Sequence, residues 1–201
     1  MLLIEEKREL RISIESNVYK ILIGGDSGVG KTTLVRVLSD DMLYYTGKTI
    51  GATFGIKKYQ LSSYGKEIIL QFWDLSGDSR FRHLLPLFAY GADILLLAFD
   101  ISNVKTLKSL YKWYLFLIRA TGRVPVILVG TKVDINSRAP MRKINKFRKN
   151  LPIASVIFTS ALKNINIDKL LKAIIANIIL RGKVPKVRVT KVYPLSNIGR
   201  K

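Results

Sequence analysis

The stretch Gly25-Asp26-Ser27-Gly28-Val29-Gly30-Lys31-Thr32 decides the fold of this 201-residue chain. It matches the pattern G-x-x-x-x-G-K-[ST] and lies between the apolar residues 18–23, which predict a buried strand, and residues 32–39, which predict a short helix. Glycines let such a loop wrap a phosphate with its N–H groups turned inward, and the helix adds its positive N-terminal end. A plain glycine turn is the alternative, but the whole string arises by chance in only about one chain in a hundred of this length. We therefore predict a phosphate-binding loop in which Lys31 reaches the terminal phosphates and the Thr32 hydroxyl ligates Mg²⁺.

Outward from this loop, the chain alternates buried strands with amphipathic helices. Residues 40–52 predict a loop and residues 76–91 an irregular stretch with a short helix, while a hairpin is expected between them around Ser62-Ser63-Tyr64-Gly65. The expected strands are 54–61, 67–74, 93–100, 125–130 and 154–159, and the longer helices are 104–121, 138–150 and 165–181, the last with Asn166 as its N-cap. This alternation indicates one α/β domain with a mainly parallel sheet.

A second motif, Trp73-Asp74-Leu75-Ser76-Gly77, ends one of these strands. A carboxylate at the C-terminal end of a strand lies on the ligand side of a parallel sheet. Asp74 can therefore hold Mg²⁺ through water, and the Gly77 N–H can reach a γ-phosphate. Taken alone, D-x-x-G is a weak signal because aspartate and glycine are common in turns.

Two further motifs follow later strands, and both suit a guanine base. In Thr131-Lys132-Val133-Asp134 a carboxylate can accept from guanine N1–H and the exocyclic amine, an arrangement that adenine lacks. The Lys132 stem can lie across the plane of the base. In Thr159-Ser160-Ala161-Leu162 the Ala161 N–H can meet guanine O6. The plain alternatives are a helix-initiating aspartate and a simple strand-to-helix turn.

These four strings, in this order, resemble the Ras superfamily of small GTPases over residues 17–181, with the phosphate loop in a Rab-like spelling. The resemblance implies a three-layer P-loop fold with a six-stranded, mostly parallel sheet and five helices. It implies a GTP/GDP switch that uses Mg²⁺ and meets effector, exchange-factor and activating proteins at two switch regions, residues 41–53 and 77–91.

The resemblance also implies the roles of individual residues. Thr49 completes the Mg²⁺ shell with Thr32 and Asp74, and either Tyr44 or Tyr45 covers the edge of the base. Catalysis would involve Lys31, Thr49, Gly77 and Asp78. The residues assigned to nucleotide binding are Gly25, Asp26, Ser27, Gly28, Val29, Gly30, Lys31, Thr32, Thr33, Thr49, Gly77, Thr131, Lys132, Asp134, Ser160, Ala161 and Leu162.

Three departures from the family pattern matter. Asp78 stands where most members have a glutamine that orients the attacking water, so we expect slow hydrolysis. The plain alternative for this residue is a cap on the short helix after Gly77. Thr131 replaces the commoner asparagine of the base motif, as in Rho proteins. The chain has no cysteine and Leu2 follows Met1, so neither prenylation nor myristoylation is expected.

Charge is the last strong signal, with a net value of +20. Residues 135–201 hold sixteen basic residues against one acidic residue, Asp168. We expect an N-terminal extension (1–16), the GTPase domain (17–181) and a basic tail (182–201) in a cytoplasmic protein without a transmembrane span. The basic helices and tail predict an electrostatic contact with an anionic membrane or an acidic partner, and the plain alternative is a solvated basic surface.

Two other functions are consistent with these residues. Asp78 would allow a GTP-bound scaffold that does not cycle. A basic nucleic-acid binder with a vestigial phosphate loop is the weaker alternative, because after residue 134 the only aromatic residues are Phe147, Phe158 and Tyr193, too few for a stacking platform.

Overall fold

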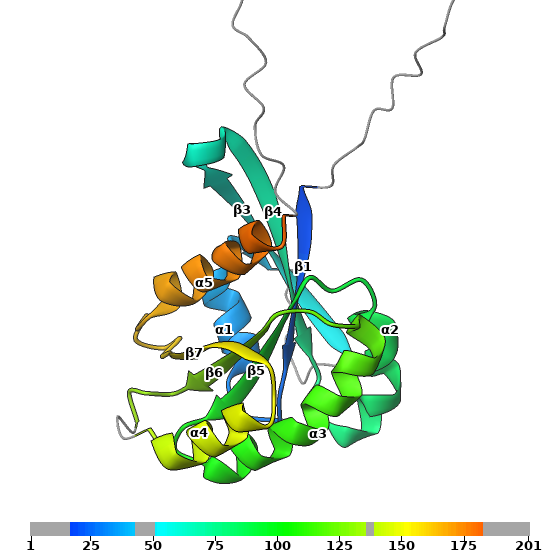
Figure 1. The fold of residues 1–201 in the computed structure, drawn as a ribbon, viewed down its shortest axis with the longest axis vertical. Coiled ribbons are helices and arrows are strands. Elements are labelled where there is room, and N and C mark those ends of the chain that lie inside the picture. Colours follow the sequence, from blue (N-terminus) through cyan, green and yellow to red (C-terminus); the bar gives the residue numbers. More distant parts are fainter. Residues whose placement is uncertain (1–16, 43–50, 136–138, 183–201) are drawn as a thin grey trace, which may run out of the picture.

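A seven-stranded sheet forms the centre of the protein in the computed structural model, which describes residues 17–42, 51–135 and 139–182 (Figure 1). The strand order is β2-β3-β4-β1-β5-β6-β7. Six strands are long: β1 (Val18–Gly24), β3 (Ala52–Leu61), β4 (Lys66–Leu75), β5 (Ile94–Asp100), β6 (Val126–Thr131) and β7 (Ile153–Phe158). The six-stranded sheet is thus confirmed, and the two-residue β2 (Asp41–Met42) adds an edge strand inside the predicted loop 40–52.

Pairing in the sheet is mostly parallel. Strand β1 lies between β4 and β5, and β6 and β7 continue on the β5 side, all in parallel register. Strand β3 pairs antiparallel with both β2 and β4, and the predicted β3–β4 hairpin turns through η1 (Ser62–Tyr64). The carboxyl ends of the parallel strands therefore meet at one edge of the sheet, where α/β folds bind their ligands.

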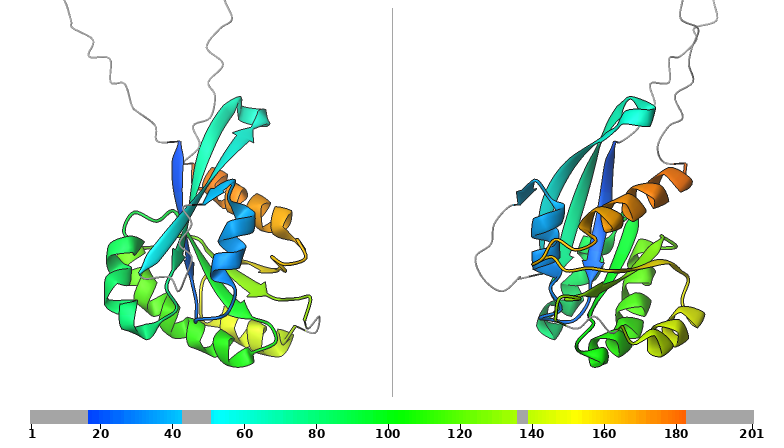
Figure 2. Two further views of the ribbon diagram at one scale, coloured as in Figure 1. Left: turned by 180° about the vertical axis from the view of Figure 1, so that it is seen from behind. Right: turned by 90° about the vertical axis from the view of Figure 1, so that its left-hand side faces the viewer.

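Five α-helices cover the sheet in two layers, which completes the expected three-layer architecture in the described part of the chain (Figure 2). Helices α1 (Lys31–Leu38) and α5 (Ile167–Leu180) pack on one face, and α2 (Leu85–Ala89), α3 (Val104–Thr121) and α4 (Met141–Lys149) pack on the other. No helix in the described residues is both long and apolar enough to cross a membrane.

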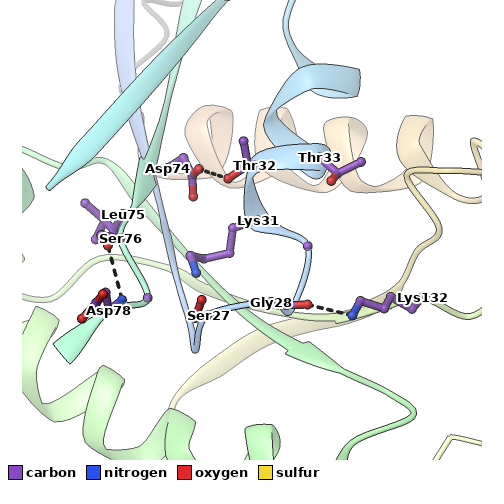
Figure 3. Close-up of a pocket in the computed structure, with 12 residues that line it drawn as sticks. Ser27, Gly28, Lys31, Thr32, Thr33, Asp74, Leu75, Ser76, Asp78 and Lys132 are labelled. Atoms are coloured by element: carbon purple, nitrogen blue, oxygen red, sulfur yellow. Dashed lines mark hydrogen bonds between the residues drawn. The ribbon is translucent and has the colours of Figure 1, made fainter. Parts of the chain in front are cut away.

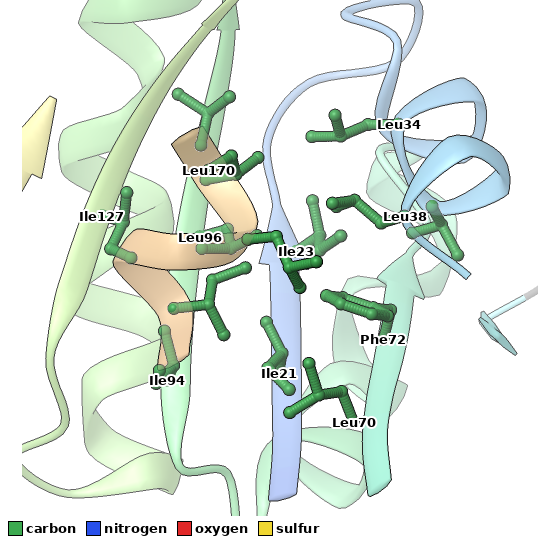
Figure 4. Packing of buried hydrophobic residues seen from close by; sticks show 14 of the residues in the cluster. Ile21, Ile23, Leu34, Leu38, Leu70, Phe72, Ile94, Leu96, Ile127 and Leu170 are labelled. Carbon is green, nitrogen blue, oxygen red and sulfur yellow. The ribbon is translucent and has the colours of Figure 1, made fainter. Parts of the chain in front are cut away.

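The core follows the alternation of the strands. Ile21 and Ile23 of β1 point toward α1 and α5, where they meet Leu34, Leu38 and Leu170 (Figure 4). Leu22 points to the opposite face and joins the cluster under α3. Each such fully buried side chain contributes about 1.5–3 kcal/mol. Strand β1 is therefore fixed from both faces, and the loop at its end starts from a rigid support.

Hydrogen bonds that the sequence pattern does not specify hold the starts of α4 and α5. Helix α4 begins at Met141 rather than at residue 138, since Pro140 is the N-cap residue and its carbonyl accepts from the N–H groups of Lys143 and Ile144 at 2.9 and 3.1 Å. Asn166 is the N-cap residue of α5 as predicted, but its side chain does not cap the helix. Its amide donates instead to the Phe158 carbonyl at 2.8 Å and ties the helix start to β7.

The predicted N-terminal extension (1–16) lies outside the described residues. The basic tail does as well, apart from Gly182.

Candidate nucleotide-binding site

The phosphate loop joins β1 to α1 at the carboxyl edge of the sheet. Gly25 has φ +150°, and a Cβ there would overlap the carbonyl oxygen of Ala98 on β5. Only glycine allows the loop to leave the strand this close to its neighbour. Gly30, at φ +95°, then directs the chain into the first turn of α1. The predicted strand–loop–helix context is confirmed.

Lys31 lies over this loop with its side chain almost fully buried (Figure 3). Its Nζ donates to the carbonyl oxygens of Gly25 and Asp26 at 2.8 and 2.9 Å. Burial lowers the pKa of Lys31, while the charges of Asp74 and Asp26 act in the opposite direction. A lysine charge at this buried position attracts a phosphate more strongly than it would in water.

Thr32 and Asp74 meet beside Lys31, although they are 42 residues apart in sequence. The Thr32 hydroxyl donates to a carboxylate oxygen of Asp74, which is fully buried at the end of β4. A hydroxyl and a carboxylate side by side are hard oxygen ligands of the type that Mg²⁺ prefers. These two residues therefore fit Mg²⁺, whereas Thr49, Tyr44 and Tyr45 lie outside the described residues.

Gly77 brings the start of the second switch region onto the phosphate loop. A Cβ at this position would overlap the amide nitrogen of Ser27 and the carbonyl carbon of Asp26. The two segments thus touch backbone to backbone. A cavity of about 600 Å³ opens beside this contact and is lined by Ser27, Gly28, Gly30, Lys31, Thr32, Thr33, Asp74, Leu75, Ser76, Gly77, Asp78 and Lys132.

Asp78 borders the same cavity but is held by its own helix. Its carboxylate accepts from the backbone N–H of Arg80 at 2.9 Å, which caps η2 (Ser79–Leu84). The Arg80 guanidinium also donates to both carboxylate oxygens, and its Nη2 lies 2.7 Å from Oδ2. These hydrogen bonds raise the pKa of Arg80. The capping role expected as the plain alternative is therefore present.

The base motifs line a second cavity, of about 230 Å³, that borders Gly30, Thr33 and Lys132 in common with the first. Asp134 is exposed at its rim. Thr131, Thr159, Ser160, Ala161 and Leu162 complete the lining around Leu34 and Ile135. The structure thus places the two base motifs together, as predicted, and joins them to the phosphate side.

Lys132 connects the two cavities through contacts that the sequence did not reveal. Its Nζ lies 2.7 Å from the Gly28 carbonyl and 2.7 Å from Oδ2 of Asp100. Burial raises the pKa of Asp100, but hydrogen bonds from Lys132 and Ser102 outweigh burial and lower it overall. Asp100 ends β5, so the strand-end rule that selected Asp74 could also have selected Asp100.

Thr131 fills a structural position in the base motif. Its buried hydroxyl lies 2.6 Å from the Val29 carbonyl and 2.9 Å from the Phe99 carbonyl, and its single proton serves these two acceptors. The side chain thereby ties β6 to the phosphate loop and to β5. Thr131, which replaces the commoner asparagine, thus makes a hydrogen bond between the base motif and the phosphate loop.

Comparison with known proteins agrees with this geometry, because the model of the Ras family matches residues 20–180. The chain belongs to the Ras family. The Ras-related protein RABG3b of Arabidopsis thaliana is 41% identical over 135 residues, which are 63% of this chain and 66% of that protein. The Ras-related protein Rab-10 of Diplobatis ommata is 37% identical over 155 residues, 76% of each chain. Rab-8A of Bos taurus is 34% identical over 154 residues, 75% of this chain and 73% of that protein.

As a Ras family member, the chain is a small GTP-binding switch protein. Proteins of this family bind GTP and GDP with Mg²⁺, hydrolyse GTP and act through regulators and effectors. Of the predicted site residues, those in the described part of the chain all lie at the two joined cavities or in the loop that borders them. Asp26 differs in the direction of its side chain, because its carboxylate is hydrogen-bonded to α3.

Proposed function

We propose that this Ras family protein is specific for guanine, depends on Mg²⁺ and hydrolyses GTP slowly without a partner. The observation that carries the proposal is the pair of joined cavities, with Lys31, Thr32 and Asp74 at one end and Asp134 at the other. The ends differ in chemistry: one offers an ammonium and hard oxygen ligands, and the other a carboxylate acceptor. A guanine nucleotide with Mg²⁺ on its phosphates matches both ends.

In this proposal the phosphate loop and Lys31 hold the phosphates, while Thr32, Thr49 and Asp74 hold the metal ion. Mg²⁺, when bound, neutralises charge on the phosphate oxygens. The Gly77 N–H serves the γ-phosphate. Thr131 and Lys132 keep the base motif against the phosphate loop, and Ser160, Ala161 and Leu162 complete the wall of the base pocket.

Base specificity is tested by competition. We expect Asp134→Ala to remove most of the preference for GTP over ATP, which reaches about 10⁴–10⁵ where a buried acceptor pairs with a substrate N–H. Displacement of a fluorescent GDP analogue by GTP and by ATP, with and without Mg²⁺, measures this directly. Asp168→Ala, an exposed acidic residue on α5, is the matched control. Equal binding of ATP and GTP by the native chain would contradict the proposal.

Slow hydrolysis is supported by the hydrogen bonds of Asp78. An ionised carboxylate accepts hydrogen bonds but donates none, and both oxygens of Asp78 already accept from Arg80. A glutamine can both accept from and donate to the attacking water. We expect Asp78→Gln to raise the single-turnover rate about tenfold or more. A native rate equal to or above that of the variant would refute slow hydrolysis through Asp78.

We further propose that the face formed by α3 and α4 docks on an anionic membrane. The two helices lie side by side (Figure 1) and contain no acidic residue. Nine exposed basic side chains cover them, and none forms an ion pair with another described residue: Lys105, Lys108, Lys112, Arg119, Arg142, Lys143, Lys146, Arg148 and Lys149. Each basic residue near such a surface contributes about 1 kcal/mol.

Co-sedimentation with vesicles of increasing phosphatidylserine content tests the dock at low and at physiological salt. Binding should require the anionic lipid and fall with salt. It should weaken in Lys108→Glu/Lys146→Glu and on removal of residues 182–201, but not in the control Lys169→Glu/Lys172→Glu on α5. If no vesicles bind even at low salt, the membrane is excluded, and an acidic protein or a solvated surface remains.

A further inference from the structure

Asp26 belongs to the phosphate loop, yet its side chain is held by α3. The Ser109 hydroxyl lies 2.5 Å from Oδ2 of Asp26, and the Trp113 indole N–H donates to Oδ1 at 2.9 Å. The same hydroxyl lies 2.9 Å from the Thr106 carbonyl, but an ionised carboxylate is the stronger acceptor. Both carboxylate oxygens therefore accept hydrogen bonds from one helix, more than 80 residues away in sequence.

Helix α3 also packs directly against the start of the loop. A Cβ at Gly24 would lie 2.8 Å from Leu117 Cδ1 and 3.4 Å from Trp113 Cε3. The Trp113 ring has a second neighbour as well, because the Arg82 guanidinium of η2 lies 5.8 Å from the ring centroid. Trp113, itself buried, is thus close to both the phosphate loop and the second switch region.

The backbone of Asp26 takes part in the phosphate end of the site. Its carbonyl accepts from Lys31 Nζ at 2.9 Å, and its peptide bond with Ser27 lies against Gly77. Any rotation of Asp26 would therefore move the support of Lys31 and the amide of Ser27 together. The residue is a common anchor for the lysine, the second switch region and α3.

We propose that Ser109 and Trp113 are positioning residues for the phosphate loop, and that their hydrogen bonds to Asp26 set how long a nucleotide stays bound. Phosphate-binding loops present N–H groups to an anion. A carboxylate of the same loop, if released, competes for those N–H groups and repels the phosphates at short range. The two donors from α3 prevent this because they satisfy both oxygens and hold them on the far side of the loop.

This role predicts an unusual pattern of mutational effects. Removing the donors while keeping the carboxylate leaves an unsatisfied charge beside the phosphates, which costs more than removing all partners together. Ser109→Ala/Trp113→Phe should therefore release GDP about tenfold faster than the native chain. Adding Asp26→Ala to this pair should slow release again, toward the native rate. A purely structural role predicts the opposite, because a third substitution could only add to the damage.

The experiment loads the full chain with a fluorescent GDP analogue and follows its release into excess GDP at fixed Mg²⁺. Melting temperatures are measured in parallel, so that release is compared well below unfolding. Tyr111→Phe, which removes a hydroxyl from an exposed position of the same helix, should release GDP at the native rate. If the double variant does not fold, Trp113→Phe and Ser109→Ala are each compared with and without Asp26→Ala. Unchanged release in the donor variants, or no slowing on loss of the carboxylate, would overturn the proposal.

Discussion

At the phosphate end of the site, binding groups are buried or belong to the backbone, whereas the carboxylate proposed to recognise the base lies on the surface. Lys31 is 6% exposed and Asp74 is fully buried, and the Gly77 contact is between backbones. Asp134, in contrast, is exposed, and Leu162 at the far side of the base cavity is 78% exposed. The first region is rigid by packing, while the second depends on the hydrogen bonds of Thr131 and Lys132 for its position.

This difference teaches how affinity and selectivity can be divided within one site. The phosphate end offers the same groups to any nucleoside triphosphate, so it supplies affinity with little discrimination between bases. The base end adds few contacts, but a misplaced acceptor there fails to recognise guanine. Substitutions at the two ends should therefore change different properties, affinity and hydrolysis at the phosphate end and base recognition at the base end, and by different amounts.

Among effects on guanine-nucleotide binding and hydrolysis, the largest is expected at the phosphate end, from Gly77→Ala. A Cβ would overlap backbone atoms of Asp26 and Ser27, so one of the two segments must move. A displacement of about 1 Å in such a site costs about 10²-fold in rate. We expect single-turnover GTP hydrolysis to fall by about that factor. Gly65→Ala in the β3–β4 turn, where φ is +58° and a Cβ meets nothing within 4 Å, is the control: it strains the backbone away from the site and should keep the native rate.

The same contrast explains how much the sequence predicted. Eight contiguous residues encode the phosphate loop, and its flanking strand and helix follow from apolar periodicity, so this end was predicted almost completely. Thr32 and Asp74 were selected from separate motifs, and the structure brings their side chains together through a hydrogen bond. The family resemblance assigned the remaining residues of the base pocket, and the structure contains a cavity that they line.

The missed contacts have a common physical cause. Thr131 reaches Val29 across 102 positions, Lys132 reaches Gly28 across 104, and Trp113 reaches Asp26 across 87. No local pattern encodes such pairs, because the packing of α3 and β6 against β1 and β5 brings them together. The late start of α4 after Pro140 and the edge strand β2 likewise depend on hydrogen bonds to carbonyls and strands that periodicity does not specify.

An intermediate effect is expected at the base end, from Thr131→Val. This change keeps the shape of the side chain but removes the hydroxyl that donates to the buried carbonyls of Val29 and Phe99. An unsatisfied buried group costs about 1–3 kcal/mol, so GDP affinity should fall roughly tenfold. Thr131→Asn, the commoner residue of the family, should retain much of the native affinity. Titration with a fluorescent GDP analogue measures both, and native affinity in Thr131→Val would mean that the hydroxyl does not position the base motif.

The smallest effect is expected where the two ends join, at Lys132 and Asp100. The hydrogen bonds that lower the pKa of Asp100 below its unfolded value of about 3.9 favour the folded state while the carboxyl is ionised. Because a lowered pKa stabilises the fold above the unfolded pKa, that contribution is complete near neutral pH and is lost as pH falls through the folded pKa.

Lys132→Met should therefore unfold more easily than the native chain near neutral pH, by no more than about 1 kcal/mol for a pair with a third of the lysine exposed. The difference should shrink as pH falls from about 4 and should vanish only below the lowered pKa, where Asp100 is protonated in the folded native chain as well. Urea unfolding across this range measures it, with Lys163→Met, an exposed lysine after β7, as the control. A difference that stays constant with pH would show that Lys132 stabilises the fold through its contact with Gly28 rather than through Asp100.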